Sequence, residues 1–300
     1  MSFEKNKNQS QTPFSRQEMI QMMRYQFDIG VDETLTEIPQ NRYQAARHAL
    51  DKLPQETAPQ THMSEAPANM PAPAQNSPQT RSQTIAHAKP PTNIKEDDFA
   101  SAQALADAAK DIDALKQAVM GFDACPLKKQ ARNTVFSDGP TSAHIMLIGE
   151  APGKEEDKEG KPFVGMSGQL LNKMLSYIGL ERDLVYITNI LPWRPPANRA
   201  PRPDETALCL PFVKKHIELI NPQLILLVGG TSAKELLQTT DGITKLRGKM
   251  QTIDINGSTY DTMAMLHPAY LLRNPIRKAE SWQDLLKVKQ FINAKGTAKA

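Results

Sequence analysis

Short apolar runs alternate with stretches of helical periodicity over the C-terminal two thirds of this chain. The apolar runs are of strand length and cover 143–148, 184–188, 224–228 and 262–266. Helical patterns cover 169–178, 205–220, 232–237 and 281–293, and an Ala-rich helix precedes them, from 98 through 119. Strands that alternate with helices predict an α/β fold with a mainly parallel sheet covered on both faces. Ligands of such folds bind at the carboxyl ends of the strands, so the loops after the strands are the candidate functional segments.

The N-terminal third of the chain has a different composition. One stretch, 15–27, places apolar residues at helical spacing, whereas 54–91 carries eight prolines and no aromatic residue. A segment of the latter kind cannot bury a core and is typical of a disordered linker. We therefore expect an extension with a short helix (1–53), a Pro/Ala/Gln-rich linker (54–97) and one α/β domain (98–300). The short helix either packs on its own chain or docks a protein partner on a flexible tether.

Composition narrows the class of protein. Of the 300 residues 39% are hydrophobic and 6% aromatic, too few for one continuous core over the whole length. No run approaches the roughly 20 apolar residues of a membrane span. The N-terminal residues also lack the apolar stretch of a secretory signal. We therefore expect a cytoplasmic protein, with no membrane partner.

Charge is unevenly distributed along the chain. The formal net charge is +3, but 242–300 holds ten Lys and Arg against four Asp and Glu. Such a local excess favours a surface that binds a nucleic-acid backbone. One solvated helix face would give the same excess.

The loop after the first predicted strand is rich in glycine and acidic residues. It reads Gly149-Glu150-Ala151-Pro152-Gly153, then an acidic cluster at 155–157, then a second glycine-rich stretch at 160–168. Glycines at this density let backbone amides approach a ligand closely, and a helix N-terminus that follows favours anionic groups. The loop is neither a Walker A loop nor a dinucleotide fingerprint. Instead of binding a ligand, the segment could also be a plain surface turn.

Polar residues also follow the second and the last predicted strands. Asn189 can present a donor and an acceptor together, the pattern that reads a nucleobase edge, or it can simply cap a turn. Arg194 and Arg199 behind it either contact phosphates or are solvated. His267 can hydrogen-bond a developing anion, although a lone histidine is more often structural. The segment Leu271-Leu272-Arg273 has the makeup of an apolar wedge with a phosphate contact.

Taken together, these loops resemble the uracil-DNA glycosylase superfamily, and most closely its family 4. The resemblance rests on GEAPGKEED, GKPFVGMSGQLL, the TN strand end, RPPANRAP and HPAYLLRNP, and it covers 122–291. It implies a three-layer α/β/α fold with a four-stranded, mainly parallel sheet. It also implies a DNA repair enzyme that binds uracil-containing DNA, flips the uracil out and hydrolyses its glycosidic bond.

The resemblance implies a role for each site residue. Phe163 would stack on the base, Asn189 would pair with its O4 and N3–H, and His267 and the 149–153 amides would stabilise the uracil anion. Glu150 or Glu156 would orient the water, because Ala151 stands where other branches carry an Asp, and Glu156 would also help exclude the thymine methyl group. Leu271 and Leu272 would fill the gap left in DNA. The remaining substrate-binding residues are Gly149, Ala151, Pro152, Gly153, Asn198 and Arg273.

The chain departs from the family pattern in its cysteines. Family 4 members typically hold a four-iron, four-sulfur cluster with four cysteines. Here Cys125 and Cys209 match two of the ligand positions, and Phe122 and Trp193 stand at the other two. Two thiolates cannot hold the cluster. We therefore expect no cluster and no other cofactor, with Phe122 and Trp193 filling its volume by packing.

Two other functions remain open from the sequence. A non-catalytic member of the superfamily would bind DNA or damaged bases without cutting. A nucleotide or phosphate hydrolase would use the acidic cluster at 155–157 to bind a metal ion, which glycosylases do not need. One domain suffices to enclose one flipped base, so we expect a monomer.

Overall fold

The computed structural model describes residues 94–296 together with Ile20, Gln21 and Arg24. These three are helical, in agreement with the periodicity of 15–27, and the rest of that segment and the predicted linker up to residue 93 lie outside the described residues. The predicted domain boundaries therefore stay predictions. In the described part of the chain, no helix is both long enough and apolar enough to cross a membrane.

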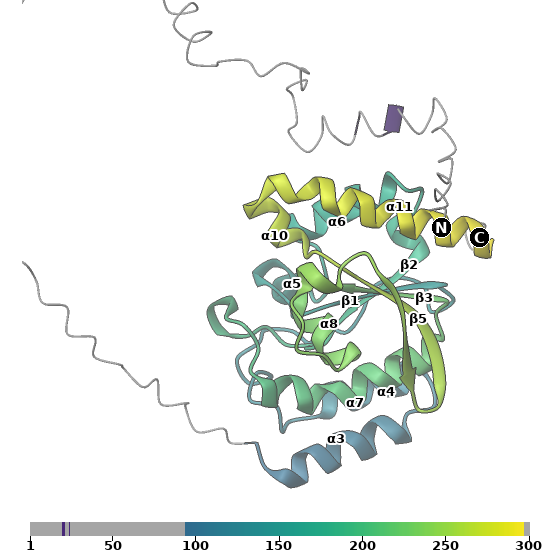
Figure 1. Ribbon diagram of the computed structural model, residues 1–300. Coiled ribbons are helices and arrows are strands. Elements are labelled where there is room, and N and C mark those ends of the chain that lie inside the picture. Colours follow the sequence, from purple (N-terminus) through teal and green to yellow (C-terminus); the bar gives the residue numbers. More distant parts are fainter. Residues whose placement is uncertain (1–19, 22–23, 25–93, 297–300) are drawn as a thin grey trace, which may run out of the picture. The chain divides into compact units, whose positions relative to one another are not determined.

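A five-stranded sheet forms the centre of the domain (Figure 1). Its strands, in the order β2-β1-β3-β5-β4, are β1 (Ile145–Gly149), β2 (Val185–Asn189), β3 (Leu224–Val228), β4 (Met250–Ile255) and β5 (Ser258–Met265). The first four in this order run parallel, which confirms the mainly parallel sheet. The register pairs Gly149 with Asn189, so the carboxyl ends of β1 and β2 meet.

Strand β4 corrects the expected count of four strands. It pairs antiparallel with β5 at the edge of the sheet, and the side chains in its first half are not buried, so no continuous apolar run marks it. The two strands join through Asn256 and Gly257, whose φ angles of 52° and 82° are those of a tight hairpin turn. The Asn-Gly dipeptide was the sequence signal for this hairpin.

Helices cover both faces of the sheet, which confirms the three-layer architecture. On one face, strand residues such as Leu147 pack with α6 (Met166–Ser176) and α11 (Lys278–Lys295), next to α10 (Pro268–Arg273). On the other face, strand residues such as Met146 pack with α7 (Pro203–Ile220) and α8 (Gly230–Leu237). Neighbouring residues of each strand thus face opposite helix layers, as the period of a strand requires.

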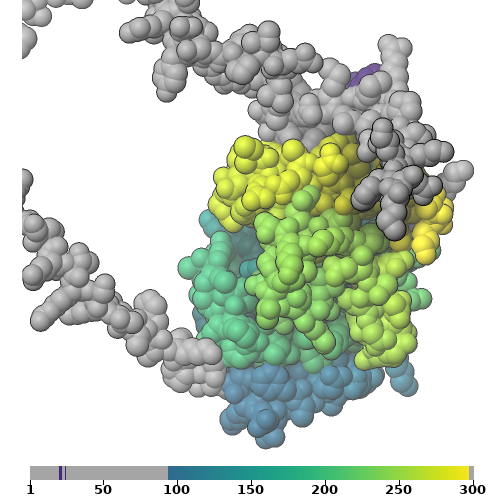
Figure 2. Space-filling view, viewed as in Figure 1, coloured from purple at the N-terminus to yellow at the C-terminus, as the bar shows by residue number. Residues whose placement is uncertain are grey.

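The predicted Ala-rich helix is two helices, α3 (Glu96–Ala108) and α4 (Ile112–Gly121). The chain breaks between them because Asp111 caps α4, its side chain accepting a hydrogen bond from the Ala114 amide at 2.7 Å. Both helices pack with α7 in a third apolar cluster. In the space-filling view, the blue segment with α3 and the yellow one with α11 form opposite ends of the domain (Figure 2). The short elements are α5 (Lys154–Glu159), α9 (Ile243–Leu246), η1 (Arg182–Leu184), η2 (Pro196–Asn198) and η3 (Pro275–Arg277).

Candidate active site

The loops that follow β1, β2, β3 and β5 surround one cavity of about 400 Å³. This is where a parallel α/β sheet places its ligands. The cavity brings together ten of the sequence-predicted site residues: Glu150, Ala151, Pro152, Gly153, Glu156, Phe163, Asn189, Asn198, His267 and Arg273. The loop after β3 contributes Gly229 and Gly230, which the sequence analysis missed.

Gly149 creates the space in which the Asn189 side chain and the Phe163 ring meet. A Cβ atom at residue 149 would lie 2.3 Å from Asn189 Oδ1 and 2.7 Å from two carbons of the Phe163 ring. Real Cβ atoms essentially never approach other atoms this closely, so any other residue here would force the amide or the ring to move. Gly149 therefore contributes room for the amide and the ring.

Phe163 is held by its backbone as well as by packing. Its φ of 52° is left-handed, and Arg182 donates from Nη1 to the Phe163 carbonyl at 2.9 Å and from Nη2 to the Pro162 carbonyl at 2.7 Å. Asp138 anchors Arg182 through an ion pair of 2.8 Å. Arg182 lies 19 residues further along the chain, in η1, and no motif in the sequence marks it. These contacts fix the ring at the cavity wall.

His267 is held as a neutral donor. Its Nδ1 accepts a hydrogen bond from the Ala269 amide at 3.1 Å, which caps α10. Burial and, to a lesser extent, the positive charge of Arg273 lower the pKa of His267 to about 4, and the negative charge of Glu156 opposes this shift. Because Nδ1 accepts, the single proton of the neutral ring sits on Nε2. The imidazole also stacks on the Phe163 ring, with centroids 5.6 Å apart.

Glu156 ties together two loops of the cavity. Its Oε2 accepts from the Gly153 amide at 3.0 Å, and its Oε1 accepts from the Val164 and Gly165 amides at 3.0 and 2.9 Å. Both carboxylate oxygens are therefore engaged, which does not favour the expected role in orienting water. The Gly153 amide, which we expected to face the uracil, is likewise bound to Glu156.

Glu150 has the other carboxylate at the cavity. Its Oε2 accepts from the Thr231 hydroxyl at 2.5 Å, and Thr231 lies in the first turn of α8. Nothing in the sequence pattern pointed to Thr231, since it lies 81 residues from Glu150. This contact engages Oε2 alone, so of the two expected acids Glu150 is the better placed to bind a water molecule.

The two leucines of α10 have different environments. Leu272 is 38% exposed, whereas Leu271 is fully buried in the core between α10 and the sheet. Leu271 therefore cannot fill a gap in DNA without leaving the core, and its expected role is wrong. The neighbouring Arg273 lines the cavity.

The acidic cluster at 155–157 does not form a metal site. Glu156 is bound to backbone amides, and Asp157 Oδ1 accepts from the amides of Arg132 and Asn133 at 2.8 and 3.1 Å. Within residues 94–296, no three His, Cys, Asp or Glu side chains come close enough to hold a metal ion. These carboxylates hold the loops together.

The four positions at which the resemblance implies cluster ligands lie together in the apolar core beside α7. Cys125, Cys209, Phe122 and Trp193 are all buried there. Trp193 donates from Nε1 to the Thr134 hydroxyl at 3.0 Å. A hydrogen bond between the two thiols lowers the pKa of Cys125, whereas that contact and burial raise the pKa of Cys209. Two thiols and two aromatic rings do not fit a cluster that needs four protein ligands.

Known proteins share the part of the chain that builds this cavity. Residues 136–286 match the model of the uracil DNA glycosylase superfamily. The chain is 39% identical over 189 residues to a type-4 uracil-DNA glycosylase of Saccharolobus solfataricus, covering 61% of this chain and 88% of the relative. It is 40% identical over 176 residues to a type-4 uracil-DNA glycosylase of Thermotoga maritima, covering 58% and 90%. A DNA polymerase of Bacillus phage SP01 is 33% identical over 165 residues, which make up 55% of this chain and 16% of the polymerase. Because the family match spans half of the chain and every loop of the cavity, the chain belongs to the uracil DNA glycosylase superfamily.

Proposed function

We propose that this protein is a uracil-DNA glycosylase that flips uracil out of DNA and releases it by hydrolysing the N-glycosidic bond, which initiates base excision repair. The observation that carries the proposal is that Asn189, Phe163 and His267 line one cavity. They offer an amide for the base edge, a ring for its face and a donor for the developing anion. Relatives named type-4 uracil-DNA glycosylase, of which the chain covers at least 88%, support the same activity.

Asn189 selects uracil over cytosine. Uracil presents the acceptor O4 next to the donor N3–H, and a carboxamide matches this pair with one donor and one acceptor. Cytosine carries an amino group in place of O4. This amino group and the Asn189 Nδ2 group, which are both donors, would then face each other at a buried side chain. Leaving such groups unpaired costs roughly 1–3 kcal/mol each. We therefore expect cytosine to be refused.

His267 stabilises the leaving uracil. Breaking the glycosidic bond leaves negative charge on the base and an oxocarbenium-like sugar, so donors aimed at uracil O2 lower the barrier. The Nε2–H of the neutral imidazole is such a donor. Its partner on the other side of the ring, the Ala269 amide, keeps the proton on Nε2.

Glu150 orients the attacking water, while Glu156 keeps the loops in place. Leu272 fills the gap that the flipped nucleotide leaves in the duplex, and Asn198 and Arg273 contact the extruded nucleotide. The activity requires no iron–sulfur cluster, because Phe122 and Trp193 supply packing where the family has ligands. The protein acts as a cytoplasmic monomer.

Incubation with a uracil-containing oligonucleotide in excess EDTA, followed by alkali, tests the proposal. Alkali cleaves the strand wherever a base has been removed, so we expect cleavage at uracil and none at cytosine or thymine. A visible absorption spectrum of the same sample tests for a cluster. A brown, absorbing protein would contradict the proposed packing role of Phe122 and Trp193.

Alanine variants test the assigned residues. Asn189→Ala and His267→Ala should each slow excision by about 100-fold or more, since each removes an interaction with the reacting base. His144→Ala is the matched control, because His144 is exposed directly before β1. If the folded wild-type protein leaves uracil in place, it is a binding module or a metal-dependent enzyme and the proposal is wrong.

A further inference from the structure

The loop that carries Asn198 has an unfavourable backbone. Residues 194–202 connect the segment after β2 to α7, and Pro195, Asn198 and Arg199 of this loop line the cavity. Ala197 and Asn198 have φ angles of 53° and 54°. Two successive left-handed residues with side chains are uncommon, and such strain persists only where surrounding contacts hold it.

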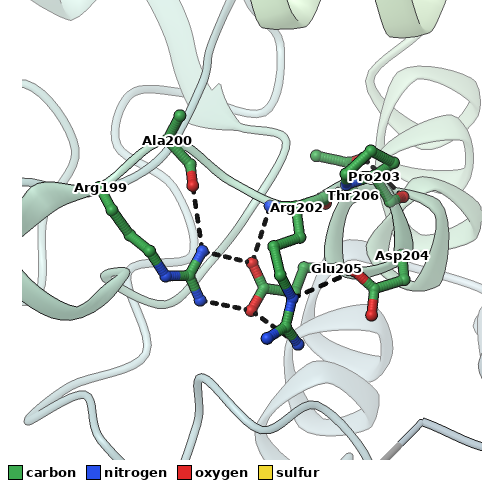
Figure 3. A network of polar contacts seen from close by, with 7 residues as sticks. All are labelled: Arg199, Ala200, Arg202, Pro203, Asp204, Glu205 and Thr206. Atoms are coloured by element: carbon green, nitrogen blue, oxygen red, sulfur yellow. Dashed lines mark hydrogen bonds and ion pairs between the residues drawn. The ribbon is translucent and has the colours of Figure 1, made fainter. Parts of the chain in front are cut away.

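Glu205 supplies these contacts from outside the loop (Figure 3). Its Oε1 accepts from Arg199 Nη2 at 2.6 Å, and its Oε2 accepts from Arg199 Nη1 at 2.9 Å. The Arg202 amide donates to the same Oε2 at 2.9 Å. Arg199 Nη1 also donates to the Ala200 carbonyl at 3.0 Å. The carboxylate thus fixes the loop directly behind Asn198.

Glu205 is anchored to the core. It lies in the first turn of α7 and is fully buried, and Leu208 and Cys209 of the same helix are core residues. Burial raises the pKa of the Glu205 carboxyl, but hydrogen bonds from Arg199 and the Arg202 amide outweigh this and hold the pKa below its usual value. Two guanidinium groups pair with this buried carboxylate, because Arg202 Nη2 also lies 3.3 Å from Glu205 Oε1. Only the Arg199 guanidinium binds both of its oxygens, so Glu205 and Arg199 act as one unit.

The Asn198 amide group is oriented within the loop. Arg194 donates from Nε to Asn198 Oδ1 at 2.7 Å. Because a guanidinium can only donate, the bonded atom is the oxygen, and Nδ2 remains as a donor for a ligand. Glu205 and Arg199 therefore hold the backbone, and Arg194 holds the amide.

We propose that Glu205 is a positioning residue of the glycosylase, which acts through Arg199 to present the Asn198 amide to the nucleotide in the cavity. This inference rests on the proposed function. Both terminal nitrogens of Arg199 are bound to Glu205. Arg199 therefore holds the loop in place, and we assign it no phosphate contact.

A double-mutant cycle tests this positioning role. Single-turnover excision from a uracil-containing oligonucleotide is measured for the wild type, Glu205→Gln, Asn198→Ala and the double variant, with a melting temperature for each. Glu205→Gln should slow excision at least about tenfold, because misplaced contact groups lose their effect. In the Asn198→Ala background the same change should slow it less than about twofold, since the residue that it positions is gone. The drop in melting temperature should be equal in both backgrounds.

A merely structural role would give a different result. The inference would be overturned if Glu205→Gln slowed excision equally in both backgrounds. It would also be overturned if either Asn198→Ala or Glu205→Gln alone excised uracil at the wild-type rate. Glu218→Gln is the matched control, because Glu218 pairs with Lys215 toward the other end of α7. If Glu205→Gln fails to fold, Arg199→Lys serves in the cycle, since lysine keeps the charge but cannot form the bidentate contact. Absence of excision by the wild type would instead refute the proposed function.

Discussion

Replacing Gly149 with alanine adds one methyl group between the two groups that recognise the base. The new Cβ would lie 2.3 Å from Asn189 Oδ1 and 2.7 Å from the Phe163 ring, whereas ordinary contacts begin at 3.4 Å. The amide must therefore move away by about 1 Å, the difference between 2.3 and 3.4 Å. The Phe163 ring cannot yield freely, because Arg182 holds its backbone.

This displacement should affect activity far more than stability. A shift of about 1 Å in a positioning group lowers a catalysed rate by about 100-fold. An extra methylene in a packed site costs about 1–3 kcal/mol of folding free energy. We therefore expect Gly149→Ala to fold, with a moderately lower free energy of unfolding, and to excise uracil about 100-fold more slowly.

Single-turnover excision and urea unfolding measure the two effects on the same protein. Gly121→Ala is the control, because a Cβ at residue 121, at the end of α4, would meet no atom within 4 Å. It should excise uracil at the wild-type rate. A folded Gly149→Ala protein with a rate within a few-fold of wild type would refute the reasoning, since Asn189 and Phe163 would then not act from where they lie.

Three further predictions concern other parts of the site. Excision should be independent of pH from neutrality down to about pH 5 and should fall as the pH approaches the pKa of about 4 for His267. Protonation of the imidazole ends the hydrogen bond that Nδ1 accepts, and the ring is then no longer held in its neutral form. A fall in the pH–rate profile centred near pH 6.5 would contradict this prediction. Leu271→Ala should lose about 2–5 kcal/mol of folding free energy in denaturant unfolding, whereas Leu272→Ala should keep its stability and slow excision from duplex DNA. The double change of Cys125 and Cys209 to alanine should leave the excision rate within about twofold of wild type, since neither thiol lines the cavity. Loss of activity together with loss of bound iron would show that the two thiols hold a cluster.

Much of the fold could be predicted because its signals are local. Apolar runs of strand length and helical periodicity mark the four parallel strands and the helices on both faces. The edge strand β4 has no such run, and only the Asn-Gly turn at 256–257 marked its hairpin. A single Ala-rich pattern hid the break at Asp111, because cap contacts are made by one side chain and leave the apolar spacing nearly unchanged.

The sequence by itself determined where the site lies, since the carboxyl ends of parallel strands meet at one edge of the sheet. Asn189 is the last residue of such a strand, and Glu150 and His267 stand in the loops that follow two others. Only the tertiary structure decided which side chains support it. Arg182 and Glu205 reach backbone groups of other segments, and nothing in their local pattern shows those partners. The same holds for the carboxylate of Glu156, which three amides from two loops engage. Periodicity reports which face of an element is apolar, but a hydrogen bond depends on the three-dimensional path of both chain segments, and that path exists only once the layers have packed.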